Sequence, residues 1–143
     1  MKDLYYVALK LFLRHGDKLL ITKDIFGEWD LPGGRIKKNE FKKPFEKIIE
    51  RKVKEELGSG VRYSLGMPVV FMRHERREAT ASNKPKVRIF AIGYEARYNG
   101  GEIRLGLVHD RFEWVSANKF DPKKYFKGGW LKGVEEYLKL QKK

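Results

Sequence analysis

Two adjacent glutamates near the middle of the chain, Glu55 and Glu56, have the type and spacing that metal chemistry needs. Neighbouring residues on a helix project about 100° apart, so both carboxylates can flank one cation. Their oxygens suit Mg²⁺ or Mn²⁺, which also take carbonyls, waters and substrate phosphates as ligands. Upstream, Gly33 and Gly34 permit tight backbone geometry that can present a carbonyl to the same ion. The sequence therefore predicts a divalent-metal site built from Gly33, Glu55 and Glu56.

A second group of residues could transfer a proton and neutralise the charge of a phosphate. Arg51 lies one helical turn before Glu55 and can hold that carboxylate through an i,i+4 contact. Arg35 can neutralise a phosphate with two parallel hydrogen bonds. His109 precedes an expected short strand, where a histidine can accept a proton from attacking water near neutral pH. Taken alone, a histidine at this position favours a structural role, hydrogen-bonded to the backbone.

The elements that must position these residues follow from the hydrophobic pattern. Apolar stretches over 4–13 and 18–22 flank a turn at 15–17 and predict a β-hairpin. A helix is expected over 44–57, with Pro44 as its first residue and Gly58 as its stop signal. Its apolar face repeats at helical spacing through Phe45, Ile48, Ile49, Val53 and Leu57.

Further strands are expected over 65–72, 87–96 and 111–115, and a turn at 99–101 leads into another extended segment at 102–105. A C-terminal helix carries an apolar stripe formed by Trp130, Leu131, Val134, Tyr137 and Leu138. Strands with one central and one terminal helix predict an α/β (α+β) protein. We expect a mixed sheet sandwiched by helices, in a single domain spanning 1–143.

Composition narrows the class of protein. The chain has 143 residues, 41% of them hydrophobic, and no cysteine, so it can bury a core without disulfides and has no thiol nucleophile. No apolar run reaches the ~20 residues of a membrane span, and we expect a cytoplasmic protein with no membrane partner. The formal net charge of +13 favours anionic partners, either small phosphorylated molecules or nucleic acid.

Together, the glycine-rich loop and the central helix resemble the Nudix box, G-x5-E-x7-R-E-U-x-E-E-x-G-U, in which U is aliphatic. The matching residues are Gly34, Glu40, Arg51, Val53, Glu55, Glu56 and Gly58, and Trp29 with Leu31, Pro32 and Gly33 resembles the usual lead-in. The resemblance implies a Nudix-type α/β/α sandwich with a mixed β-sheet. It also implies Mg²⁺, with Mn²⁺ as an alternative, and hydrolysis of a nucleoside diphosphate linked to another moiety.

Two features depart from the pattern. Ten residues rather than seven separate Glu40 from Arg51, and because the extra residues precede Phe45 we expect them to lengthen the loop. Lys52 stands where the pattern has a glutamate, four residues before Glu56 and on the same helical face. An ammonium there cannot ligate metal, would oppose a second ion and could pair with Glu56 itself.

Within the family, the chain is most similar to the branch that hydrolyses GDP-mannose. Lys38 and Glu40 match residues of its loop, and His109 and Asp110 match its His-Asp pair. The resemblance implies that His109 is the general base for attack of water on the anomeric carbon, so that GDP leaves. Val108 stands where this branch has a glutamine metal ligand, which predicts weaker metal binding.

The same resemblance assigns the basic side chains. Arg35 and Arg51 match arginines that support the leaving-group charge or the metal ligand, and we count both as catalytic. Arg35, Lys38 and His74 are the expected substrate contacts. His74 belongs to a basic run with Arg73, Arg76 and Arg77, for which an exposed loop is the alternative interpretation.

We therefore expect a hydrolase acting on a nucleotide sugar such as GDP-mannose. One alternative is a pyrophosphohydrolase acting on ADP-ribose or nucleoside triphosphates, in which water attacks phosphorus and Glu40 or Glu113 serves as base. Another alternative is a catalytically weak module that binds nucleotides or RNA. The sequence leaves open the base, the sugar and the formation of a homodimer.

Overall fold

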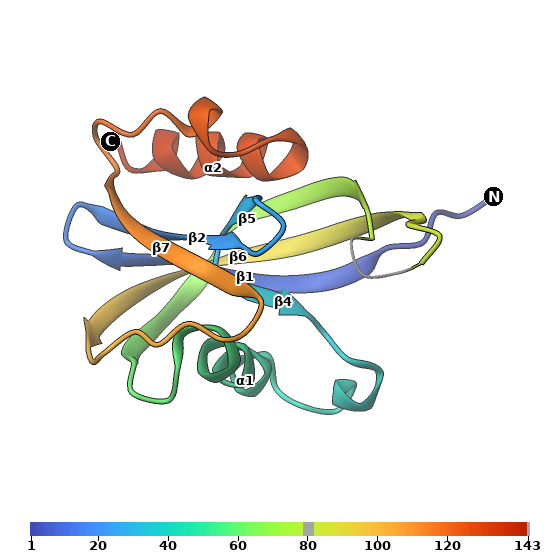
Figure 1. Ribbon diagram of the computed structural model, residues 1–143, viewed down its shortest axis with the longest axis horizontal. Coiled ribbons are helices and arrows are strands. Elements are labelled where there is room, and N and C mark those ends of the chain that lie inside the picture. The colour runs from blue at the N-terminus through green and yellow to red at the C-terminus, as the bar shows by residue number, and fades with distance from the viewer. Residues whose placement is uncertain (79–81, 143) are drawn as a thin grey trace.

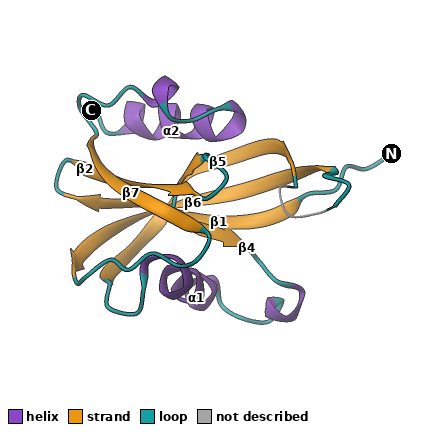
Figure 2. Cartoon of the chain, viewed as in Figure 1, coloured by secondary structure: helices purple, strands orange, loops and turns teal. Residues whose placement is uncertain are grey.

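A seven-stranded mixed sheet lies between two helices, with α1 against one face and α2 against the other (Figure 1). This computed structural model describes residues 1–78 and 82–142. The strands are β1 (Tyr6–His15), β2 (Lys18–Asp24), β3 (Trp29–Asp30), β4 (Gly33–Arg35), β5 (Arg62–Arg77), β6 (Lys86–Gly100) and β7 (His109–Ser116). The helices are α1 (Phe45–Leu57) and α2 (Gly128–Leu140), with short 3₁₀ turns η1 (Lys38–Glu40) and η2 (Pro122–Lys124) (Figure 2). The predicted mixed sheet sandwiched by helices is confirmed.

Strand β1 has two different neighbours along one of its edges. The main order is β3-β2-β1-β6-β5, with β1 and β6 parallel and the other pairs antiparallel. β1 pairs with β2 only near the hairpin turn, at Arg14 and His15, and further back it pairs with β4 from Ala8 to Lys10. The two partners therefore diverge along β1, and between them the Leu11 N–H donates to the carbonyl of Pro32, which follows β3.

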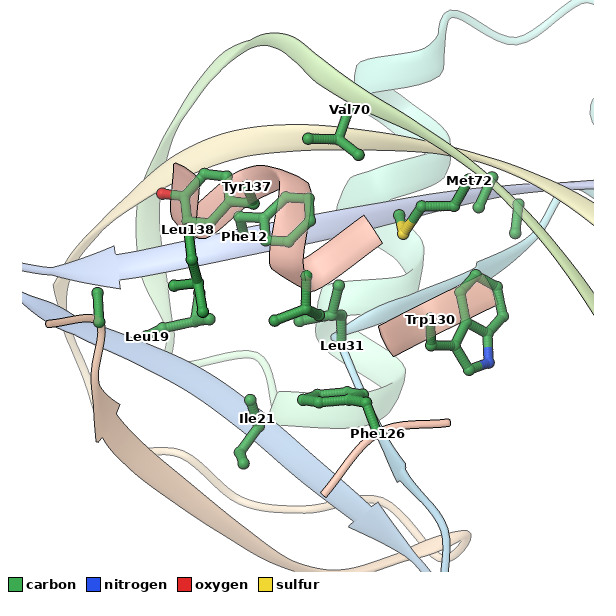
Figure 3. Close-up of a cluster of buried hydrophobic side chains, with 14 of the residues drawn as sticks. Phe12, Leu19, Ile21, Leu31, Val70, Met72, Phe126, Trp130, Tyr137 and Leu138 are labelled. Carbon is green, nitrogen blue, oxygen red and sulfur yellow. The ribbon is translucent and has the colours of Figure 1, made fainter. Parts of the chain in front are cut away.

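Two apolar cores cover the two faces of the sheet. In the core under α2, the ring of Phe12 stacks on Tyr137 with centroids 4.1 Å apart, and Trp130 and Phe126 pack nearby (Figure 3). The core under α1 joins Ile48, Ile49, Val53 and Leu57 to the opposite face of β1. Because side chains alternate along a strand, β1 contributes Ala8 and Phe12 to the first core and Leu9, Leu11 and Leu13 to the second.

Most of the expected elements are confirmed, with three differences. The basic run 73–77, for which an exposed loop was the alternative interpretation, lies within β5 and pairs with β6. Helix α1 begins at Phe45, and Pro44 is its N-cap with an extended ψ of 147°, not its first helical residue. The segment 102–105 is not a strand. Instead, the Arg104 and Gly106 N–H groups donate to the carbonyls of Leu57 and Glu56 at the end of α1. Those carbonyls lack partners within the helix, so the segment satisfies them in place of a neighbouring strand.

Within the described ranges 1–78 and 82–142, no helix has the length and apolar character that crossing a membrane requires.

Candidate active site

A cleft of about 450 Å³ opens where β1 separates from β2. It brings together residues from the loop before α1, the end of α1, β1, β3, the end of β5 and the start of β7. They include Lys10, Asp30, Gly33, Arg35, Arg51, Lys52, Glu55, Glu56, Glu78, Val108 and His109. The three predicted metal-site residues and the predicted base therefore share one cleft.

Gly33 and Glu56 are fixed against each other. The Gly33 N–H donates to Glu56 Oε1 at 3.0 Å, and Glu56 is only 6% exposed. Gly33 has a φ of +131°, and a Cβ at this position would lie 2.0 Å from the carbonyl oxygen of Leu9 on β1. Only glycine fits so close to β1, so this residue locks the loop onto the sheet beside the α1 carboxylate.

Lys52 lies between the two carboxylates of α1. Its Nζ is 3.4 Å from Glu55 Oε2 and 3.4 Å from Glu56 Oε2, which confirms the expected pairing with Glu56. The aliphatic part of Lys52 covers Gly34, where a Cβ would meet Lys52 Cε at 2.3 Å. The side chain therefore places one positive charge where both carboxylates can reach it.

The donor set suits Mg²⁺ at a single position. Outside residues 79–81 and 143, no cluster of three or more His, Cys, Asp or Glu side chains could hold an ion. Mg²⁺ needs fewer protein ligands than that, because it commonly binds through one or two carboxylates together with waters and substrate phosphates. Glu55, Glu56 and the Gly33 carbonyl fit this mode, with Lys52 as the competing cation.

Arg51 ties the loop to the helix. Its Nε and Nη2 donate to the two carboxylate oxygens of Glu40, both at 2.7 Å, and its Nη1 donates to Glu55 Oε1 at 3.0 Å. The hydrogen bonds from Arg51 lower the pKa of buried Glu40 to about 2. Glu40 also accepts the Lys37 N–H at 2.8 Å, so it holds the lengthened loop in place and is poorly suited to act as a base.

Arg35, the last residue of β4, also lines the cleft. Its guanidinium stacks on Tyr6, 4.6 Å from the ring centroid, and donates to both oxygens of Glu78 at 2.8 and 2.6 Å. These hydrogen bonds lower the pKa of Glu78. The arginine is therefore oriented before any phosphate arrives, and an incoming phosphate must share it with Glu78.

His109 is the first residue of β7 and pairs with Asp24 on β2. Its Nδ1 is buried and, in the part of the chain that the structure describes, has no hydrogen-bond partner. Buried polar atoms normally have one, so this nitrogen calls for a partner such as a bound water or a substrate. Asp110 follows at an irregularity in the β2–β7 register, where it has no partner on β2, and it is exposed.

Three residues considered from the sequence lie outside this cleft. Lys38 is exposed on η1. His74 on β5 faces α2, where its ring stacks on Trp130 with centroids 4.5 Å apart and its Nδ1 accepts the Gly129 N–H at 3.0 Å. Glu113 lies on β7 and accepts from Arg111 at 2.9 Å. None of these three residues lines the cleft that contains the metal-site carboxylates.

Sequence reasoning did not identify Lys10, Asp30 and Glu78 as cleft residues. The charge of Lys10 within an apolar strand could have indicated a functional residue. No sequence pattern indicated Glu78, because its partner Arg35 lies 43 residues away in the chain.

The pH dependence of folding tests the buried position of His74. Burial lowers the pKa of His74 from 6.5 to about 4. The unfolded chain therefore binds a proton at this residue before the folded protein does, and stability is lost as pH falls through that interval. Glu40, with a pKa of about 2, is protonated only at lower pH. We expect this histidine to cost up to about 2 kcal/mol of unfolding free energy between pH 7 and pH 4.5. Urea unfolding should show a smaller loss in His74→Gln, which retains an acceptor for Gly129. Equal pH dependence of the two proteins would contradict the assignment.

The fold is similar to those of solved Nudix proteins. The MutT protein from Methanosarcina mazei Go1 superposes with a TM-score of 0.76 at 20% identity, over 100% of this chain and 99% of that chain. An ADP-ribose pyrophosphatase from Streptococcus suis 89-1591 gives 0.67 at 16% identity, over 96% and 92%. A NUDIX hydrolase from Nitrosomonas europaea gives 0.72 at 12% identity, over 99% and 74%.

No protein-family model matches the chain, and no curated protein matches it significantly in sequence. At these identities the structural likeness concerns the fold, which is the Nudix fold that the sequence resemblance implied. The closer resemblance to the GDP-mannose branch stays a prediction.

Proposed function

We propose that this protein hydrolyses a nucleoside diphosphate derivative, and that its substrate is a nucleotide sugar such as GDP-mannose. The observation that carries the proposal is the position of His109. This residue lies in one cleft with Arg35, Glu55 and Glu56, and its buried Nδ1 has no partner among the described residues. A base, a phosphate-binding arginine and a pair of metal-binding carboxylates are the groups that such a hydrolysis needs.

The roles of the side chains follow from their contacts. The imidazole of His109 takes a proton from water as the water oxygen attacks the anomeric carbon, and the bond from that carbon to the diphosphate oxygen breaks. Arg35 neutralises the departing diphosphate through its planar fork. Glu55, Glu56 and the Gly33 carbonyl would hold Mg²⁺, which when bound stabilises diphosphate charge. Arg51 positions Glu55 through its 3.0 Å hydrogen bond.

The alternative of attack on phosphorus has less support in this site. Its candidate bases were Glu40 and Glu113. Both oxygens of Glu40 are bound to Arg51, and Glu113 does not line the cleft. The ADP-ribose pyrophosphatase named above shares the fold. Hydrolysis of ADP-ribose is therefore the competing activity that an assay must include.

Product analysis tests the proposal directly. The protein should convert GDP-mannose with Mg²⁺ into GDP and free mannose, identified by mass. Release of GMP and mannose 1-phosphate would instead place the attack on phosphorus. Turnover of ADP-ribose or nucleoside triphosphates, with no turnover of nucleotide sugars, would overturn the substrate class. Absence of any turnover together with steeply salt-dependent RNA binding would favour a binding module.

Replacing Lys52 with glutamate should raise the affinity for Mn²⁺, or the number of ions bound, in the protein without substrate. The change removes an ammonium 3.4 Å from both carboxylates and supplies a ligand in its place. Mn²⁺ binding can be followed by electron paramagnetic resonance. Lys54→Glu is the matched control, because Lys54 is an exposed lysine of the same helix that pairs with Glu50. Equal affinity and stoichiometry in both variants would contradict the competition between Lys52 and the ion.

A further inference from the structure

Lys10 breaks the pattern of the strand in which it lies. In β1, which the structure describes throughout, residues 8–13 are all buried, and Lys10 is the charged member of that run at 5% exposure. A strand covered on both faces normally carries apolar residues, because burying a charge costs free energy unless the charge is paired. Such local departures from the folding pattern are expected at functional sites.

The charge of Lys10 is balanced inside the cleft. Its Nζ lies 2.9 Å from Asp30 Oδ2, and it also lies 5.2 Å from the centroid of the Trp130 ring. The side chains of Lys10 and Asp30 are 6% and 20% exposed, and both residues line the cleft. Three elements, β1, β3 and α2, therefore converge on one pair of opposite charges at the floor of the cleft.

This pair retains hydrogen-bonding capacity for a ligand. An ammonium has three donors, and here Asp30 Oδ2 takes one and the Leu31 carbonyl, at 3.5 Å, takes another. An ionised carboxylate has about four acceptor positions, of which Lys10 and the Leu31 N–H occupy two. A donor and acceptors thus lie side by side, which is the arrangement that a group carrying several hydroxyls can satisfy.

The chemistry of the pair favours hydroxyls over phosphate. A phosphate would gain from Lys10 but would be repelled by Asp30, whereas a hydroxyl can donate to one and accept from the other. The position agrees with this choice. Lys10 is opposite Gly33 in the β1–β4 register, and the Gly33 N–H donates to Glu56. Asp30 pairs with Thr22, two residues before Asp24, the partner of His109.

We propose that Lys10 and Asp30 form the subsite for the sugar ring that is attached to the diphosphate. The inference rests on the proposed function and adds to it the residues that recognise the hydroxyls. Asp30 accepts hydrogen bonds from sugar hydroxyls and Lys10 donates one to a hydroxyl oxygen, so that the anomeric carbon faces His109.

Binding in a slowed enzyme tests the subsite. In the His109→Gln background, calorimetry with Mg²⁺ can compare GDP-mannose with GDP, which lacks the sugar. The double variant Lys10→Met/Asp30→Asn removes both charges at similar volume, and so avoids leaving one buried charge unpaired. We expect the affinity for GDP-mannose to fall at least ~10-fold while that for GDP changes less than about twofold.

Asp3→Asn is the matched control, because Asp3 pairs with Arg88 on the exposed surface, away from the cleft. It should leave both affinities unchanged, and thermal unfolding should show that every variant is folded. An equal fall for GDP and GDP-mannose, an unchanged affinity for GDP-mannose, or no binding of GDP-mannose in the background protein would each overturn the proposal. A separate assay tests the proposed function: if it is wrong, the wild-type protein will not release GDP from GDP-mannose.

Discussion

The variant His109→Gln should turn over GDP-mannose roughly 10²–10⁴-fold more slowly than the wild-type protein, which is the usual contribution of a positioned general base. Glutamine retains hydrogen-bonding groups but cannot take the proton from water. Steady-state rates of the wild-type protein and the variant at neutral pH measure the effect.

A matched control is available in His15→Gln. His15 is an exposed histidine at the end of β1, and its ring contacts Tyr98 and Trp114 away from the cleft. Its replacement should leave the rate unchanged. A comparable loss in both variants would indicate a general effect of losing a histidine, and an unchanged rate in His109→Gln would remove this residue from the mechanism.

Isotope labelling decides the position of attack independently of any variant. Hydrolysis in ¹⁸O-labelled water should place the label in the sugar, because the oxygen between the anomeric carbon and phosphorus leaves with GDP. Label on phosphorus would exclude attack on carbon. His109 would then orient the substrate or support the fold, and the pyrophosphohydrolase alternative would replace the proposed reaction.

The variant Glu56→Gln should lose at least ~100-fold in rate if the carboxylate binds the metal ion that stabilises the diphosphate. The substitution is nearly isosteric, and its amide oxygen can still accept the Gly33 N–H now held at 3.0 Å. The fold should therefore survive, as thermal unfolding can show. Rates are compared at saturating Mg²⁺, so that the loss reflects the missing carboxylate charge beside the ion and not an empty site.

Glu50→Gln provides the comparison within the same helix. Glu50 pairs with Lys47 and Lys54 on the outer side of α1, so its neutralisation should leave the rate unchanged. Full activity of Glu56→Gln at saturating Mg²⁺ would disprove the metal assignment. Equal losses in both variants would point to the charge of the helix instead of a ligand at one position.

The local parts of the site could be predicted from the sequence because they lie within one regular element. The contacts of Arg51 with Glu55 and of Lys52 with Glu56 follow from the four-residue spacing on a helix, and both are present in α1. The apolar face of α1 and the hairpin of β1 and β2 follow in the same way from their periodicity.

Contacts between distant segments could not be predicted from the sequence. Arg35 meets Glu78 across 43 residues, and Lys10 meets Asp30 across 20. His74 accepts a hydrogen bond from Gly129, 55 residues away, and so lies against α2 instead of in the cleft. None of these pairs has a periodic signature, because each depends on which strands become neighbours and in which register.

The types of reactive side chain, the sandwich of helices around a mixed sheet and the spacing of charges along α1 could be predicted from local patterns. Which of these groups meet in the cleft depends on tertiary packing. Helix and strand periodicity is a property of neighbouring residues. The divergence of β1 from β2, which creates the cleft, instead results from the packing of two cores and the pairing of β1 with β4 and β6.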